Sequence, residues 1–242
     1  MSTSCIEVCE LSKAFHGRKV VDNLTFSVEK GQVFGLLGHN GAGKSTTIEM
    51  ILGLKKPDSG QAVILGKEAG KHRREIFEKV GVQLQASSYQ AAIRVDEVCR
   101  EHAALYKEPK DYRGLLEKFG LSELEKSQVM KLSGGERQKL SVVLALIGNP
   151  QIVFLDELTT GLDVAARREV WRTLKDLKDA GLTIFLTTHY MEEAETLCDR
   201  VVLIKNGKKV AGGTVAEVVE QSPYGSLEEA YLWYMEIVSS DL

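Results

Sequence analysis

The sequence predicts an α/β fold in which a largely parallel sheet is covered by helices, with an antiparallel flank near its start and a helical subdomain inserted in its middle. The first observation is a set of short apolar runs without polar alternation, typical of strands buried on both faces. These runs are Val33–Leu37, Ile152–Leu155, Thr183–Leu186 and Val201–Ile204. The second is a change to helical periodicity between about residues 88 and 148. Together they predict a layered α/β domain interrupted by helices.

Length and composition exclude several classes of protein. The 242 residues are 43% hydrophobic and 27% charged, as in ordinary globular domains, which excludes disordered and fibrous chains. The net charge of −3 is too near neutral for the basic surface that nucleic acids need, so no nucleic-acid partner is expected. The four scattered cysteines and the absence of a signal-like start predict a reduced, cytosolic chain. No apolar stretch reaches the length of a membrane span, so we expect any membrane contact to go through a partner.

The antiparallel flank is predicted from the first thirty or so residues. Ile6–Leu11, Lys19–Val21 and Leu24–Glu29 have the composition of strands. The turn-prone pairs His16-Gly17 and Asp22-Asn23 separate them. We therefore expect three short strands joined by two turns.

The helical periodicity sets the expected subdomain boundaries. One predicted helix face carries Val95, Val98, His102 and Leu105, and a second helical segment carries Leu115, Leu116, Phe119 and Leu121. Near the end of the sequence, Leu227, Ala230, Tyr231 and Tyr234 have the spacing of one closing helix. We expect a single domain over residues 1–242, with a core at 1–87 and 149–225, a helical subdomain at 88–148 and a C-terminal helix at 226–242.

A phosphate-binding pattern follows the first buried strand. Residues 38–45 match G-x-x-x-x-G-K-[ST], the Walker A or P-loop motif, and precede the helical pattern Thr46–Leu54. Glycines let the backbone N–H groups surround a phosphate, and the helix directs its positive end at the same anion. Lys44 is expected to reach the β- and γ-phosphates, and Ser45 to hold Mg²⁺. The alternative, a glycine-rich turn without a ligand, is much less consistent with this strand and helix context, so a nucleoside triphosphate is predicted.

Two adjacent carboxylates end a second buried strand. Asp156 and Glu157 follow the apolar run Ile152–Leu155, a position that needs a cation or a reacting group nearby. Asp156 is suited to the Mg²⁺ shell, and Glu157, pointing elsewhere, to polarising a water that attacks the γ-phosphorus. Taken alone, the pair is equally well explained as helix-capping acids.

Residues 132–138, Leu-Ser-Gly-Gly-Glu-Arg-Gln, decide between these explanations. Together with the P-loop and the acidic pair, they resemble the signature of the ATP-binding cassette (ABC) family. Thr160–Asp163 resembles the D-loop of that family, and Leu186–His189 resembles its switch-histidine loop. The motifs occur in family order, and the resemblance extends from about Ile6 to Thr214. It implies a RecA-like P-loop NTPase core that hydrolyses ATP with Mg²⁺.

The resemblance also implies roles for individual residues. Those implied for nucleotide binding are Phe15, Asn40, Gly41, Ala42, Gly43, Lys44, Ser45, Thr46, Ser133, Gly134, Gly135 and Asp163. Those implied for catalysis are Lys44, Gln85, Glu157 and His189, and those implied for metal binding are Ser45, Gln85 and Asp156. Phe15 would stack on adenine in place of the more usual tyrosine. Gln83 is a less favoured alternative to Gln85 as the Q-loop glutamine.

Dimerisation follows from the same resemblance. Ser133, Gly134 and Gly135 open a predicted helix, and their N–H groups form a second anion site. In this family that site caps the γ-phosphate of ATP bound to the opposite subunit. We expect a head-to-tail dimer with a second copy or a paralogous ATPase subunit, in which Asp163 lies across the interface. Leu158, where relatives usually carry proline, is expected to leave the following loop less rigid.

The expected function is ATP hydrolysis that powers a separate integral membrane permease from the cytoplasmic face of the cell membrane. Residues 35–46, 188–195 and 226–231 resemble the branch that exports drugs, antibiotics and lipids. Tyr89 is a candidate permease contact or, equally well, part of the subdomain's own core. An importer subunit, a soluble ABC ATPase and an inactive ATP-binding subunit remain alternatives. A GTPase would need an Asn-Lys-x-Asp motif, which this sequence lacks.

Overall fold

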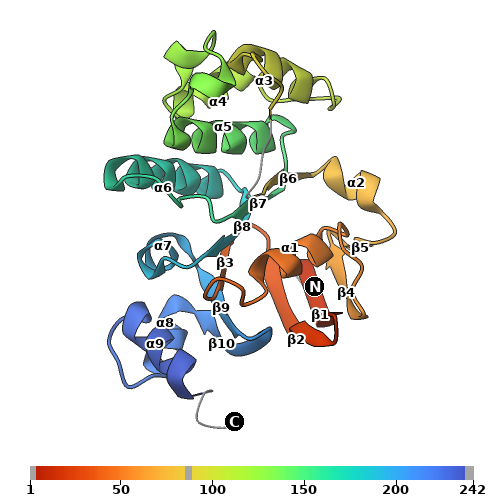
Figure 1. Cartoon of the computed structure of the whole chain (residues 1–242), viewed down its shortest axis with the longest axis vertical. Helices are drawn as coiled ribbons and strands as arrows, with labels where there is room; N and C mark the ends of the chain where they lie inside the picture. Colours follow the sequence, from red (N-terminus) through yellow and green to blue (C-terminus); the bar gives the residue numbers. More distant parts are fainter. Residues whose placement is uncertain (1–3, 85–88, 238–242) are drawn as a thin grey trace. The chain divides into compact units, whose positions relative to one another are not determined.

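The computed structural model describes residues 4–84 and 89–237. The chain divides into two compact units, residues 1–76 with 185–242 and residues 77–184. Figure 1 labels the helices and strands of both units. The fold is α/β with parallel and antiparallel sheets and flanking helices, as predicted. Within the described part of the chain, no helix is long and apolar enough to cross a membrane.

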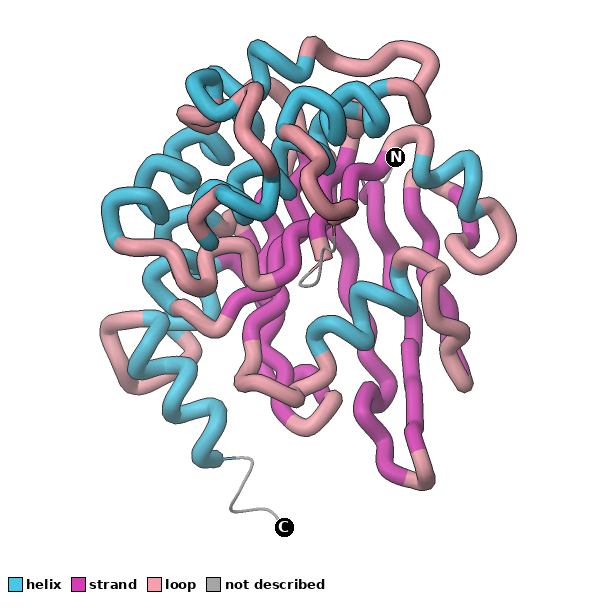
Figure 2. The backbone as a smooth tube through the Cα atoms, turned by 45° about the horizontal axis from the view of Figure 1, so that its top comes forward, coloured by secondary structure: helices cyan, strands magenta, loops and turns pink. Residues whose placement is uncertain are grey.

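The first unit holds a four-stranded antiparallel sheet and most of a mainly parallel one. The antiparallel sheet has the order β2-β1-β4-β5, and the other sheet includes the order β10-β9-β3-β8. The strands are β1 (Ser4–Phe15), β2 (Arg18–Glu29), β3 (Val33–Leu37), β4 (Ser59–Ile64), β5 (Lys67–Glu68), β8 (Thr183–Thr188), β9 (Arg200–Lys205) and β10 (Lys208–Thr214). The helices are α1 (Lys44–Ile51), α2 (Arg73–Phe77), α7 (Met191–Leu197), α8 (Val215–Glu220) and α9 (Leu227–Ile237). Strands and helices are separated by colour in Figure 2.

The core of the first unit forms where β2, β3 and β8 meet. The rings of Phe26 and Phe34 stack with their centroids 5.0 Å apart. Phe185 completes the cluster, with its centroid 5.3 Å from that of Phe34. All five residues of β3 are buried, as the unalternating apolar run predicts. This packing fixes the strand that leads into residues 38–45.

The second unit is built around α5 (Gly134–Ile147), which contacts α3, α4, β6 and β7. The parallel strands are β6 (Val80–Gln83) and β7 (Ile152–Asp156), and the other helices are α3 (Val95–Ala103), α4 (Tyr112–Lys118) and α6 (Val164–Asp179). Short 3-10 turns occur at Ser122–Leu124 and Val129–Lys131. The predicted helices therefore lie between β6 and β7 in the chain. The division at residues 88 and 148 remains a prediction.

Two local expectations are wrong. Asp22-Asn23 is not a turn between strands, because β2 runs unbroken from Arg18 to Glu29. Lys13 pairs with Val21 and Leu11 with Leu24, so β2 carries one extra residue there, and Asn23 adopts a φ of 54°. This is a β-bulge, which asparagine tolerates in the left-handed region. Leu105 does not share the buried face of α3, because that helix ends at Ala103 and Leu105 is 75% exposed.

The close approach of β6 to α5 requires glycine at position 81. A Cβ atom on Gly81 would lie 2.0 Å from the carbonyl oxygen of Ala145. We expect Gly81→Ala to lower the free energy of unfolding by about 1–3 kcal/mol, since the backbone must shift to remove the clash. Urea denaturation measures this effect. Gly114→Ala in α4 is the matched control, because its Cβ would meet nothing nearer than Asp111 Oδ2 at 3.5 Å. Equal midpoints for both variants would show that the close approach is not rigid.

Candidate nucleotide-binding site

The P-loop of the first unit joins β3 to α1. Its last glycine, Gly43, has a φ of 107° and precedes the first helical residue, Lys44. A Cβ on Gly43 would lie 2.5 Å from the carbonyl oxygen of Val20, so both the backbone conformation and the space demand glycine. The loop therefore presents bare backbone at the positive end of a helix, which is the arrangement that binds phosphate.

Hydrogen bonds hold the P-loop in shape. The N–H of Ala42 donates to the carbonyl of His39 at 3.1 Å, and the N–H of Gly207 donates to the carbonyl of Ala42 at 3.0 Å. Thr47 Oγ1 donates to the carbonyl of Gly43 at 2.8 Å. Asn40 and Gly41 at the tip are exposed, as is Ser45. These bonds therefore order the backbone that the motif predicts to bind an anion.

The P-loop lysine lies inside the loop. The side chain of Lys44 is buried, and its Nζ donates to the carbonyls of Gly38 at 2.8 Å and His39 at 3.2 Å. Carbonyl oxygens satisfy part of the charge of the ammonium, but an anion would satisfy it better. The residues present therefore fit a nucleotide phosphate.

Phe15 and His189 lie in the same unit as the P-loop. Phe15 ends β1 and is 38% exposed, with the ammonium groups of Lys55 and Lys13 at 5.0 and 5.7 Å from its ring centroid. These cations hold the ring through its π-face. His189 follows β8, and its ring packs against that of Tyr190 with centroids 4.2 Å apart.

The acidic pair lies in the second unit. Asp156 is the last residue of β7 and is buried, and its backbone N–H donates to Gln83 Oε1 at 3.1 Å. Glu157 follows with a φ of 51°, a left-handed conformation that turns the chain sharply after the strand. The chain thus turns immediately after Asp156, and the separate roles of the two carboxylates stay a prediction.

The structure separates the two candidate Q-loop glutamines. Gln83 is buried, bonds the backbone of Asp156 and donates through Nε2 to the carbonyl of Leu84 at 3.1 Å. It thus supports the end of β7, a role that the motif does not reveal. Gln85 lies outside the described residues, so its role stays a prediction.

The signature residues begin α5. Ser133 Oγ accepts from the N–H of Glu136 at 3.2 Å, and the Glu136 carboxylate accepts from the N–H of Ser133 at 2.7 Å. This is a capping box, whose Ser-x-x-Glu pattern is legible in the sequence. The bond from the Ser133 backbone lowers the pKa of Glu136, so its carboxylate stays ionised. Ser133 and Gly134 are exposed.

Two contacts join the signature to its neighbours in the second unit. A Cβ on Gly135 would lie 3.0 Å from Leu162 Cδ2, so the signature and the segment Thr160–Asp163 pack closely. Gln138 Nε2 donates to the backbone carbonyl of Glu157 at 3.4 Å. Asp163 is the N-cap of α6 and accepts from the N–H of Ala166 at 2.9 Å. Its carboxylate therefore has a local structural task, in addition to any role in an interface.

The residue sets thus fall in different units. Phe15, the P-loop with Lys44 and Ser45, and His189 belong to the first unit. The acidic pair, Ser133–Gly135 and Asp163 belong to the second. Hydrogen bonds order the P-loop in the first unit, and the end of β7 and the start of α5 in the second.

Comparisons with known proteins agree on one family. The family model "ABC transporter" matches residues 21–160. The Nod factor export ATP-binding protein I of Ralstonia nicotianae is 40% identical over 235 residues, covering 95% of this chain and 73% of that protein. A probable multidrug ABC transporter ATP-binding protein of Escherichia coli, YbhF, is 35% identical over 94% of this chain, which spans 41% of the longer protein.

Solved structures give the same result. A structure described as the ATP-binding subunit of an ABC transporter superposes with a TM-score of 0.88 and 29% identity, covering 96% of this chain and all of the other. An ATP-binding cassette in its ADP conformation matches in fold, with a TM-score of 0.80 and 24% identity over 96% of this chain and 99% of that one. Since the family model covers more than half of the chain and the relatives nearly all of it, the protein belongs to the ABC transporter family, as an ATP-binding and ATP-hydrolysing subunit.

Proposed function

We propose that two chains associate head to tail and hold two ATP molecules, each between the P-loop of one chain and Ser133–Gly135 of the other. The second chain is another copy of this protein or a paralogous ATPase subunit. The observation that carries this proposal is the exposed N-terminus of α5. Ser133 and Gly134 begin a 14-residue helix and are exposed, although their N–H groups and the helix dipole suit an anion. One chain thus carries two anion sites, and in the head-to-tail dimer both would contact ATP.

Each residue has a proposed task in hydrolysis. Lys44 and the P-loop N–H groups bind the β- and γ-phosphates, and Glu157 takes a proton from the attacking water. His189 contacts the γ-phosphate and holds the geometry of attack. Mg²⁺ would neutralise charge that develops on the phosphates, and the oxygen donors of Ser45, Asp156 and Gln85 are the kind it prefers.

The stacking role of Phe15 is tested by its removal. Phe15→Ala is expected to raise the KM for ATP about tenfold, because base stacking on an aromatic ring contributes roughly 1–3 kcal/mol. Phe15→Tyr keeps the ring and is expected to keep the KM. Steady-state phosphate release over a range of ATP concentrations measures both. If Phe15→Ala had the KM of the wild type, Phe15 would not be a nucleotide-binding residue.

We further propose that ATP hydrolysis powers export through a membrane permease, from the cytoplasmic face of the membrane. The names of the relatives, a Nod factor export ATP-binding protein and a multidrug ATP-binding protein, support the direction. A cavity of about 570 Å³ in the second unit supports a docking place. It is lined by Tyr89, by residues of α3 and by residues of α5. Half-buried Tyr89 thus faces a hollow that a permease segment would fill.

Copurification from gently solubilised membranes tests the transport role. We expect mass spectrometry to find a multi-span permease in stoichiometric amount with the tagged protein. The architecture of that permease then distinguishes export from import. Recovery of the protein with ribosomes, with nucleic acid or alone in the soluble fraction would favour a soluble ABC ATPase instead.

A further inference from the structure

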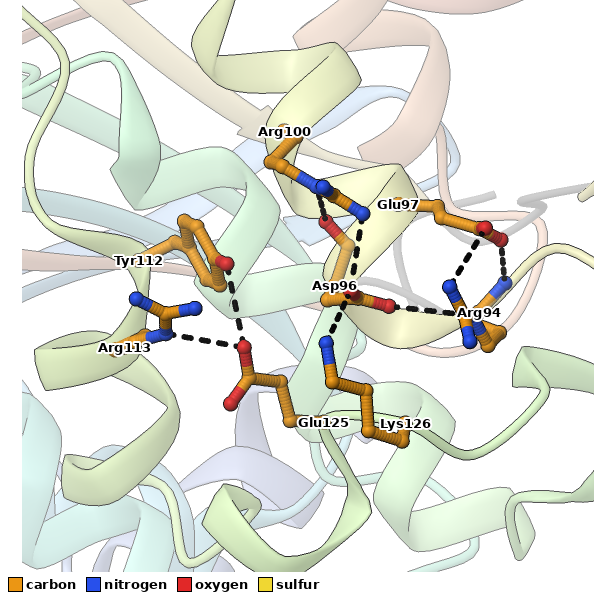
Figure 3. Close-up of polar contacts among 8 residues, drawn as sticks. All are labelled: Arg94, Asp96, Glu97, Arg100, Tyr112, Arg113, Glu125 and Lys126. Atoms are coloured by element: carbon orange, nitrogen blue, oxygen red, sulfur yellow. Dashed lines mark hydrogen bonds and ion pairs between the residues drawn. The ribbon is translucent and has the colours of Figure 1, made fainter.

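An ionic cluster around one buried carboxylate in the second unit joins segments that lie about thirty residues apart in sequence. Figure 3 shows its members, which come from the start of α3, the start of α4 and the loop before the signature. At its centre is Asp96, whose side chain is 2% exposed. The cluster serves none of the ATP contacts proposed above, yet it lies in the segment that leads to Ser133.

The backbones of residues 93–96 and 125–129 are paired, and we call this pairing the clamp. The N–H groups of Val95 and Asp96 donate to the carbonyls of Ser127 and Glu125 at 3.0 and 2.9 Å. The N–H of Val129 donates to the carbonyl of Ile93 at 2.9 Å, and Arg94 and Gln128 form an antiparallel bridge. The loop before the signature is therefore attached along its length to the start of α3.

Asp96 adds side-chain bonds to the clamp. Its Oδ2 accepts from Lys126 Nζ at 2.8 Å and from Arg100 at 3.0 Å, and its Oδ1 lies 3.5 Å from Arg94 Nε. The bond from Lys126 lowers the pKa of Asp96, so the carboxylate is ionised at neutral pH. A buried carboxylate persists only when it is paired, and here one partner lies on the loop itself.

The clamp continues directly into the signature. Val129 begins a 3-10 turn over Val129–Lys131, and the N–H of Leu132 donates to the carbonyl of Val129 at 3.2 Å. Val129 and Leu132 are both buried. Ser133 comes next and caps α5. A shift of the clamped loop is therefore passed to Ser133 through a short, packed turn.

We propose that Asp96 is a positioning residue for ATP turnover, which holds Ser133 in place through Lys126 and the clamp. This inference rests on the proposed contact between Ser133 and the ATP of a second chain. Without the Asp96 charge, Lys126 loses its partner, and the loop keeps the backbone bonds of the clamp and the bonds of Glu125 to Tyr112 and Arg113. ATP still binds to the P-loop, but Ser133 of the opposite chain is no longer held in the position that contacts the γ-phosphate.

Five substitutions in this chain test the role of Asp96. Asp96→Asn keeps the shape and removes the charge. Lys126→Met removes the partner at an exposed site, and Lys126→Arg restores a cation. Glu97→Gln is the matched control, because it removes a carboxylate from the same helical turn, keeps an acceptor for the N–H of Arg94, and bonds Arg94 rather than the loop 125–129. Ser133→Ala serves as the benchmark for the signature contact.

The readouts are kcat from phosphate release, the Kd of a fluorescent ATP analogue with Mg²⁺, and thermal denaturation. We expect Asp96→Asn to lower kcat about tenfold, as slight misplacement of a reacting group does, with the Kd unchanged. Lys126→Met should also lower kcat, and Lys126→Arg and Glu97→Gln should match the wild type. If Asp96→Asn fails to fold, the two Lys126 variants decide the question.

The outcomes separate this inference from the function on which it rests. Suppose that Ser133→Ala slows turnover while Asp96→Asn and Lys126→Met have the same kcat as Glu97→Gln. The positioning role of Asp96 is then wrong. A weaker Kd in Asp96→Asn, with kcat kept, would also overturn it. If Ser133→Ala itself turns over at the wild-type rate, the shared ATP site is what fails.

Discussion

A Glu157→Gln substitution is expected to reduce ATP turnover by at least about 100-fold, because the amide cannot accept the proton of the attacking water. Glutamine keeps the size of the side chain and adopts the same backbone conformation at similar cost. ATP binding should therefore survive, and ATP-bound dimers should accumulate. Phosphate release measures the first effect, and size-exclusion chromatography with light scattering measures the second.

Glu228→Gln is a suitable control for Glu157→Gln. Glu228 is an exposed acid in the first turn of α9 and has no proposed part in catalysis. It should leave turnover and oligomeric state unchanged. If Glu157→Gln retained the wild-type rate, the carboxylate would not be the general base. A wild-type chain that binds ATP without turnover would identify an inactive partner subunit.

Lys44→Ala is expected to weaken ATP binding about 100-fold, a loss of about 3 kcal/mol, because charge-assisted hydrogen bonds to the phosphates disappear. The stability of the nucleotide-free chain is expected to fall by less than the binding free energy does. The carbonyls of Gly38 and His39 each lose a donor, which water can replace in an open loop. Titration with a fluorescent ATP analogue measures the binding, and thermal denaturation without nucleotide measures the fold.

Lys30→Ala provides the comparison for Lys44→Ala, since Lys30 is exposed in the turn between β2 and β3. It should bind the analogue as tightly as the wild type. Wild-type affinity in Lys44→Ala would mean that the P-loop backbone alone carries the anion. Loss of the native thermal transition would mean that Lys44 chiefly stabilises the loop.

The α/β fold was predictable because its strands are signalled locally. Val33–Leu37 and Ile152–Leu155 are apolar at every position, and both form fully buried strands. β4 and β10 gave no such signal, since Ser59-Gly60 and Gly212-Gly213 resemble loop sequence. Those strands exist because a neighbouring strand pairs with them, and such pairing is not visible in one segment of sequence.

The motifs of the site were predictable from the sequence, but the hydrogen bonds that hold those motifs in place were not. Ser133-Gly134-Gly135 and Lys44 are marked by type and spacing. The supporting bonds join distant positions: Gln83 to Asp156, and Asp96 to Lys126. A glutamine at a strand end and an aspartate in a first helical turn are common in any protein. Only the fold shows what each one contacts.

The turn between β9 and β10 has a consequence for protein engineering. Gly207 is bonded on one side to Ala42 in the P-loop and on the other to Asp22 in β2, whose N–H donates to its carbonyl at 2.9 Å. A hairpin tip is ordinarily the first choice for inserting an epitope or for opening a chain in a circular permutant. In this protein the tip is part of the wall of the phosphate loop, more than 160 residues away in sequence. A label belongs instead near Ser222–Gly225, which is mostly exposed and lies between α8 and α9.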